Sequence, residues 1–101
     1  MNQMQQMIIQ MQKAQRELQK AQAELEQKEF KINKAGLVSI TVLGSKEIVS
    51  INVEEDGFEP DNKEMIEDLI KDGLNELFAQ IDGEFAKIEE KIAGRSGGFG
   101  F

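Results

Sequence analysis

NQMQQMIIQMQKAQRELQKAQAELEQK, residues 2–28, is the stretch around which this chain is organised. Apolar or small residues recur in it at alternating intervals of three and four, at Met4, Met7, Met11, Ala14, Leu18, Ala21 and Leu25. This is the a/d seam of a heptad repeat, which is typical of a helix that packs against another helix. A helix of about 26 residues is about 39 Å long. The pattern therefore predicts a projecting helical arm, and we expect the seam to form a dimer interface.

Beyond residue 28 the apolar period changes from about 3.5 residues to 2, which indicates β-strands. Strands are predicted at residues 30–33, 37–43 and 47–53, with turns at Ala35-Gly36 and Gly44-Ser45. The middle strand alternates Val and Ile with Ser and Thr, so one of its faces is apolar. These strands predict a three-stranded antiparallel meander that needs a cover on one side.

An acidic loop, EEDGFEPDN, occupies residues 54–62. Asn52, Glu54 and Asp56 have the spacing of the first calcium ligands of an EF-hand loop, but Lys63 stands where a bidentate Glu is required. The loop also follows a strand rather than a helix. We therefore interpret it as a connection between strand and helix, and we predict no metal site and no cofactor.

A second long helix is predicted at residues 63–93, where the apolar stripe is broad enough to cover a sheet face. Gly73 and Gly83 interrupt this helix, and each costs up to about 1 kcal/mol relative to Ala, which suggests close packing or a bend. Residues 94–101, GRSGGFGF, are predicted to be a flexible Gly-rich tail. Residues 1–93 then form a single α+β domain with an arm at 1–28, a sheet at 29–53, a loop at 54–62 and a helix at 63–93.

The composition of the 101 residues argues against several classes of function. There is no Cys and no His, which removes the commonest nucleophilic, acid–base and zinc chemistry, and no nucleotide-binding or nucleophile motif is present, so we do not expect an enzyme. No apolar run is long enough for a membrane span, and the N-terminus does not have the pattern of a signal peptide. We expect a cytoplasmic protein without a small-molecule substrate.

Charge is distributed unevenly along the chain, whose net charge is −7. Residues 1–46 hold seven Lys and Arg against four Asp and Glu, a balance of +3, whereas residues 47–101 hold five against fifteen, a balance of −10. Lys13, Arg16 and Lys20 are spaced i, i+3, i+7 and share the face of the arm opposite the seam. This cation row is either a solvated outer face or a row of phosphate contacts.

A family resemblance extends over nearly the whole chain. After the Met- and Gln-rich first helix come AGLVSITVLG at residues 35–44, IVSINV at 48–53, DNKEMIEDLI at 61–70, Asn75 and a Gly-rich end. In this order the chain resembles the YbaB/EbfC family of bacterial nucleoid-associated proteins. The resemblance implies a homodimer with projecting helical arms, located in the nucleoid. It also implies binding to duplex DNA with little sequence specificity and a role in nucleoid organisation or gene expression.

The expected architecture is thus α+β in the order α-β-β-β-α. If the resemblance holds, the cation row would contact phosphates, and Lys31, Lys34 and Arg95 would add to it. No aromatic residue lies on the arm, which disfavours stacking on single strands, and no base-reading motif is present. The alternative is a scaffold module whose seam docks a partner helix and which does not bind DNA.

Overall fold

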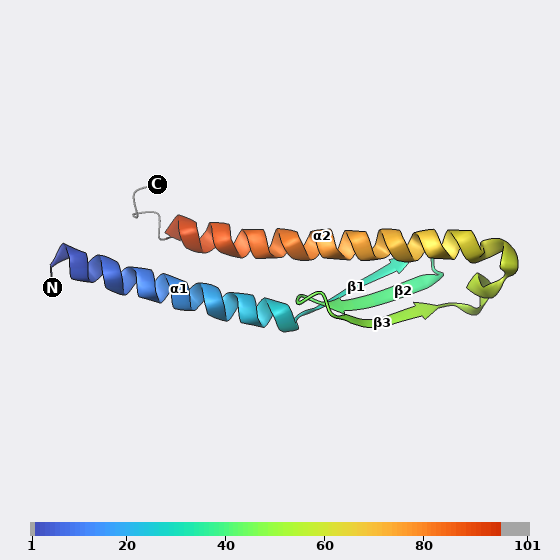
Figure 1. The fold of residues 1–101 in the computed structure, drawn as a ribbon, viewed down its shortest axis with the longest axis horizontal. Helices are drawn as coiled ribbons and strands as arrows, with labels where there is room; N and C mark the ends of the chain where they lie inside the picture. The colour runs from blue at the N-terminus through green and yellow to red at the C-terminus, as the bar shows by residue number, and fades with distance from the viewer. Residues whose placement is uncertain (1, 96–101) are drawn as a thin grey trace.

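The computed structural model describes residues 2–95 and has the predicted order α-β-β-β-α (Figure 1). Two long helices flank a three-stranded sheet, and two short 3-10 helices connect the sheet to the second long helix. The elements are α1 (Gln3–Gln27), β1 (Glu29–Lys34), β2 (Val38–Leu43), β3 (Ile48–Val53), η1 (Glu55–Phe58), η2 (Pro60–Asn62) and α2 (Lys63–Arg95). The predicted fold class is confirmed, and the acidic loop is the segment that forms η1 and η2.

The sheet is an antiparallel meander in the order β1-β2-β3. The β1–β2 turn is tight because Ala35 and Gly36 both take positive φ, 57° and 70°. Two successive residues with positive φ are the geometry of a type I′ turn, whose twist matches that of the strands it joins. In the register, Ile40 of β2 lies between Ile32 of β1 and Ile51 of β3, so apolar side chains of all three strands share one face.

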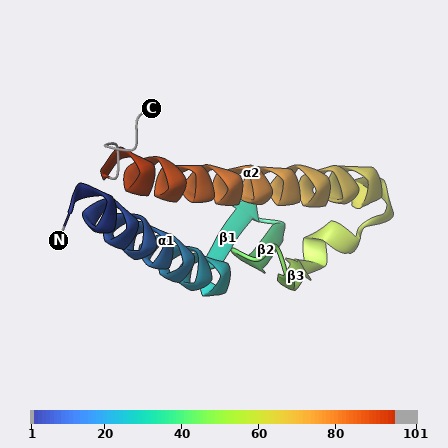
Figure 2. The ribbon, with the colours of Figure 1, turned by 60° about the vertical axis from the view of Figure 1, so that its left-hand side comes forward.

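α2 runs along this apolar face and supplies the other half of the core (Figure 2). The fully buried side chains are those of Val38, Ile40, Val42, Leu77 and Ile81. Gly73 allows α2 to approach the sheet, because a Cβ at that position would lie 2.9 Å from Ile40 Cδ1. Gly83 faces open space, where a Cβ would meet nothing within 4 Å. Close packing therefore accounts for Gly73 and does not account for Gly83.

The base of α1 is fixed to the β2–β3 turn. The Gly44 amide donates to the Lys28 carbonyl at 2.9 Å, and the Ser45 amide donates to the Glu26 carbonyl at 3.1 Å. A side chain at Gly44 would overlap the Leu25 carbonyl, so only glycine allows the turn to approach the helix end this closely. These hydrogen bonds satisfy carbonyls that the end of a helix otherwise leaves without partners.

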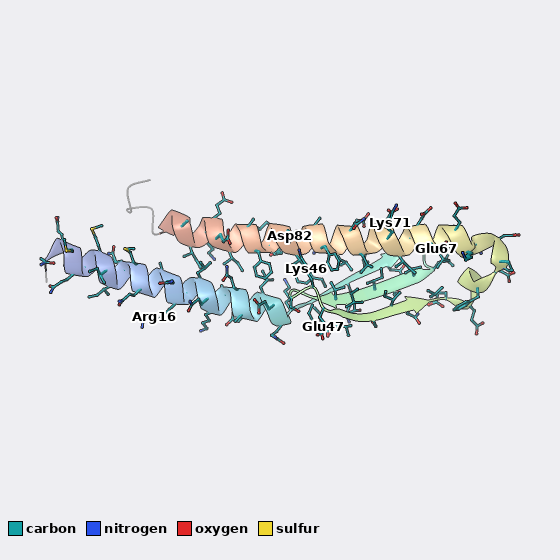
Figure 3. The ribbon with its side chains drawn as sticks, viewed as in Figure 1. Arg16, Lys46, Glu47, Glu67, Lys71 and Asp82 are labelled. Atoms are coloured by element: carbon teal, nitrogen blue, oxygen red, sulfur yellow. The ribbon has the colours of Figure 1, made fainter. Side chains whose placement is uncertain are left out.

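The same turn is also attached to α2. Lys46 Nζ lies 2.8 Å from Asp82 Oδ1 and 5.8 Å from the centre of the Phe78 ring, and the labelled Lys46 and Asp82 side chains approach each other in Figure 3. Lys46 itself takes a positive φ of 73°. The turn is therefore held between the two long helices, and it sets where α1 leaves the body.

The molecule is strongly elongated, with extents of 71 × 22 × 14 Å and a radius of gyration of 20.1 Å. A compact chain of this length would have a radius of gyration of about 13 Å. In Figure 1 the two long helices run in opposite directions, and the first turns of α1 extend past the end of α2. Among residues 2–95 no helix is long and apolar enough to cross a membrane.

Candidate nucleic-acid interface

The cation row of Lys13, Arg16 and Lys20 lies on α1, and all three side chains are exposed. Within the described part of the chain, none of the three forms an ion pair. Figure 3 shows Arg16 on the side of α1 that faces away from α2. Lys13 and Lys20 are seven residues apart, which corresponds to about 10 Å along the helix axis. This distance equals about three nucleotides of one DNA strand, each of which rises about 3.4 Å along the duplex axis. The row can therefore follow a phosphate backbone.

The other predicted cations have different surroundings. Lys31 Nζ lies 3.6 Å from Glu29 Oε2, and its side chain is exposed. Lys34 Nζ donates to Glu76 Oε1 at 2.9 Å, and only 23% of its side chain is exposed, so it connects β1 to α2. The side chain of Arg95 lies outside the described part of the structure. Of the predicted cations whose side chains are described, those of the cation row are the ones without an acidic partner.

The charges of α2 oppose the approach of a polyanion from that side. Lys63–Arg95 holds nine Asp and Glu against five Lys and Arg. The hollow between the base of α1 and α2 is lined by Glu26, Asp82 and Glu89, and its Lys46 is already paired with Asp82. A duplex would meet net negative charge in this hollow, whereas Arg16 of the cation row lies on the side of α1 that faces away from α2. Electrostatics therefore favours the outer side of α1 as the site for a nucleic acid.

The seam is divided between two environments. Leu25 is 7% exposed and belongs to the core of its own chain, and Ala14, Leu18 and Ala21 are partly buried along the side that faces α2. The distal seam residues Met4, Met7 and Met11 are exposed, Met4 to 71%. A heptad pattern indicates that a helix packs against another helix, but it does not say which one. Here the lower half of the seam packs along α2 of the same chain.

A second apolar surface, which the sequence analysis did not single out, lies on β3. Ile48 pairs with Val42 and Ile51 with Ile40, so both point to the core side of the sheet, yet they are 46% and 42% exposed. β1 and β3 are the two edge strands of the sheet, and α2 packs mainly over β1 and β2, so β3 is the edge strand that it leaves uncovered. Ile48–Val53 contains no charged residue and no Pro, although edge strands usually carry such residues to prevent pairing. That absence is the signal that could have revealed this surface.

The acidic loop of residues 54–62 forms hydrogen bonds within itself. Among residues 2–95, no group of three or more carboxylates is placed to hold a metal ion. The loop tested as a calcium site folds into η1 and η2, where the Asn62 side-chain amide donates to the Asp56 carbonyl at 2.9 Å. The loop therefore connects β3 to α2, and a hydrogen bond links η1 to η2.

Comparison with known proteins is consistent with these features. The family model described as the YbaB/EbfC DNA-binding family matches residues 1–96. A nucleoid-associated protein of Lachnoclostridium phytofermentans is 42% identical over 65 residues, covering 64% of this chain and 55% of the relative. A nucleoid-associated protein of Clostridium botulinum is 40% identical over 68 residues, covering 66% and 60%. One from Mycoplasmopsis pulmonis is 35% identical over 66 residues, covering 65% of each chain. The matched part thus spans 55–65% of the length of these relatives.

Proposed function

The chain belongs to the YbaB/EbfC DNA-binding family, and from this premise we propose that it is a nucleoid-associated protein that binds duplex DNA as a homodimer with little sequence specificity. Its action in the cell is to organise the nucleoid or to affect gene expression. The observation that carries the proposal is the cation row, which is exposed and unpaired within the described residues, with Arg16 on the side of α1 that faces away from the acidic α2.

Binding in this proposal is driven by phosphate contacts. Each Lys or Arg that neutralises a phosphate releases condensed counterions, so the affinity falls as salt rises. Two arms provide six cations, and the logarithm of the binding constant should fall with the logarithm of the salt concentration with a slope of about −5. Phosphate contacts carry no sequence information, and this accounts for the lack of specificity.

The proposed homodimer is joined through β3. An antiparallel second copy of β3 would satisfy the open backbone groups of the strand, and it would cover Ile48 and Ile51, which α2 leaves exposed. The chain has 7407 Å² of accessible surface, whereas a compact monomer of its mass has about 5800 Å². An excess of this size is comparable to the surface that a stable protein interface buries. The surface excess reflects the elongated shape of the chain, so the choice of this edge rests on the open strand and on the exposed Ile48 and Ile51.

Antiparallel pairing reverses the second chain. The two arms then point to opposite ends of the dimer, because α1 runs roughly along the strand direction (Figure 1).

A salt series of gel shifts with the purified protein tests the function. We expect a random-sequence duplex to be bound at about 50 mM salt and released steeply by about 200 mM, as counterion release requires. In the competing scaffold hypothesis, the exposed apolar seam docks a partner helix. This hypothesis predicts that the protein shifts no duplex, whatever its sequence, even at about 50 mM salt. That result would rule out the DNA-binding function.

A further inference from the structure

The tip of α1 carries an apolar patch that the body does not cover. The tip patch consists of Met4, Met7, Ile8 and Met11, which share one face because Ile8 follows Met4 by four residues and precedes Met11 by three. All four are large, exposed apolar residues, whereas the lower part of the seam is covered by α2. Met11 lines a shallow apolar groove with Ile92 of α2, so the patch begins where the packing between the two helices ends.

The sequence of the tip is almost a palindrome. Residues 3–12 read QMQQMIIQMQ, and reflection about the point between residues 7 and 8 places Met4 on Met11 and Met7 on Ile8. The flanking glutamines at positions 3 and 12, and at 5 and 10, also exchange places. In an antiparallel helix pair with two-fold symmetry, each residue faces its reflected counterpart on the other copy. The patch is therefore complementary to itself, which is the property that an isologous contact requires.

Charge also favours a second copy as the partner. Residues 2–12 contain no charged side chain, so two tips approach without repulsion although the chain as a whole has a net charge of −7. Methionine side chains adapt to irregular surfaces, which suits contacts among three Met and one Ile from each copy. We propose that the tip patch pairs antiparallel with the tip patch of another dimer, with Met4 against Met11 and Met7 against Ile8.

This pairing would link dimers into bridges between DNA segments. It rests on the proposed function, since it takes the DNA-binding dimer as its unit. The two arms of a β3-linked dimer point to opposite ends, so a tip meets a tip from a different dimer and the chain of contacts stays open. The cation row lies on the side of α1 opposite the tip patch, which leaves it available for phosphates. A pair of tips can then hold two duplexes together.

The contact is small, so we expect weak and concentration-dependent association. Four side chains from each copy cannot provide the roughly 1200–2000 Å² that stable complexes bury. Several dimers bound to the same duplex raise the local concentration of tips and favour pairing. Dilution in the absence of DNA should separate the dimers again.

Sedimentation velocity of the full chain without DNA tests the pairing with two matched variants. Ile8→Gln removes one member of the tip patch, and Ile9→Gln changes the neighbouring residue, which lies on the cation face and is similarly exposed. We expect the weight-average mass of the wild type and of Ile9→Gln to rise about twofold above that of the dimer with concentration, while Ile8→Gln remains a dimer. Association of Ile8→Gln equal to that of the wild type, or no wild-type species above the dimer, would overturn the proposal.

Disulfide cross-linking tests the orientation, since the chain contains no cysteine. A mixture of the Met4→Cys and Met11→Cys chains should form a disulfide-linked pair under mild oxidation, and each variant alone should form none. Linkage of Met4→Cys to itself would contradict the antiparallel arrangement. Both measurements are made without DNA, whereas duplex binding is tested separately by the wild-type gel shift. Tip pairing and DNA binding can therefore be contradicted independently of each other.

Discussion

Single residues fix the positions of the long helices relative to the sheet. Gly73 brings α2 against Ile40, and Gly44 brings the β2–β3 turn against the end of α1. Gly83 has no such neighbour, because a Cβ at this position of α2 would meet no atom within 4 Å. The sequence identified Gly73 and Gly83 as exceptional residues within a helix, but it could not distinguish them. Whether the absence of a Cβ allows close packing depends on which element lies opposite the glycine, and the sequence does not show this.

The two glycines of α2 should respond in opposite directions to substitution by alanine. Gly83→Ala should raise the free energy of unfolding by about 0.5–1 kcal/mol, the difference in helix propensity. Gly73→Ala gains the same propensity, but its Cβ would press on Ile40 Cδ1, so we expect a net loss of about 1–3 kcal/mol. Urea unfolding at one fixed protein concentration measures both. Stabilisation by Gly73→Ala would contradict the close packing.

Two positions of the seam, Leu25 and Met7, provide a second contrast. Leu25→Ala empties a core site and should cost about 2–5 kcal/mol of unfolding free energy. Met7→Ala changes an exposed side chain and should alter that free energy by no more than about 0.5 kcal/mol. Equal losses at the two positions, measured by the same urea titrations, would show that the seam has one environment along its length.

At the scale of elements, β3 and α1 each have surroundings that the sequence alone does not reveal. Alternation of apolar residues correctly predicted the three strands and their order, and the wide stripe of the second helix correctly indicated a sheet cover. The pattern of residues 47–53 could not show that α2 leaves Ile48 and Ile51 exposed, because that depends on where the helix crosses the sheet. The heptad seam likewise predicted helix packing without showing that its lower half meets α2.

The assignment of the dimer to β3 predicts which substitutions give monomers. Ile51→Lys places a charge on the apolar side of the edge strand, and we expect the mass measured by light scattering to fall from that of a dimer to that of one chain. Ser50→Lys, on the opposite face of the same strand, should remain dimeric. Met7→Lys should also remain dimeric, because the tip is not the primary dimer contact. A monomeric Met7→Lys together with a dimeric Ile51→Lys would move the interface to the arm.

At the scale of the whole molecule, shape and charge divide the chain into an acidic body and an arm that carries the cation row. Charge counting predicted this division from the sequence, with +3 before residue 47 and −10 after it. Counting could not show that Lys34 is engaged with Glu76 while Lys13, Arg16 and Lys20 have no acidic partner among the described residues. The separation matters for function, because an approaching polyanion is attracted by the cation row on α1 and repelled by the net negative charge of α2.

The most direct test of this account compares two triple variants in a gel-shift salt series. One carries Lys13→Ala, Arg16→Ala and Lys20→Ala, and its matched control carries Lys63→Ala, Lys71→Ala and Lys87→Ala on α2, so the net charge changes equally. We predict that the control keeps a log–log salt slope of about −5, as in the wild type, and that the arm variant loses most of both its slope and its affinity while it remains a dimer. An arm variant that binds the duplex as tightly as the control at about 50 mM salt would contradict the claim that α1 carries the DNA-binding surface.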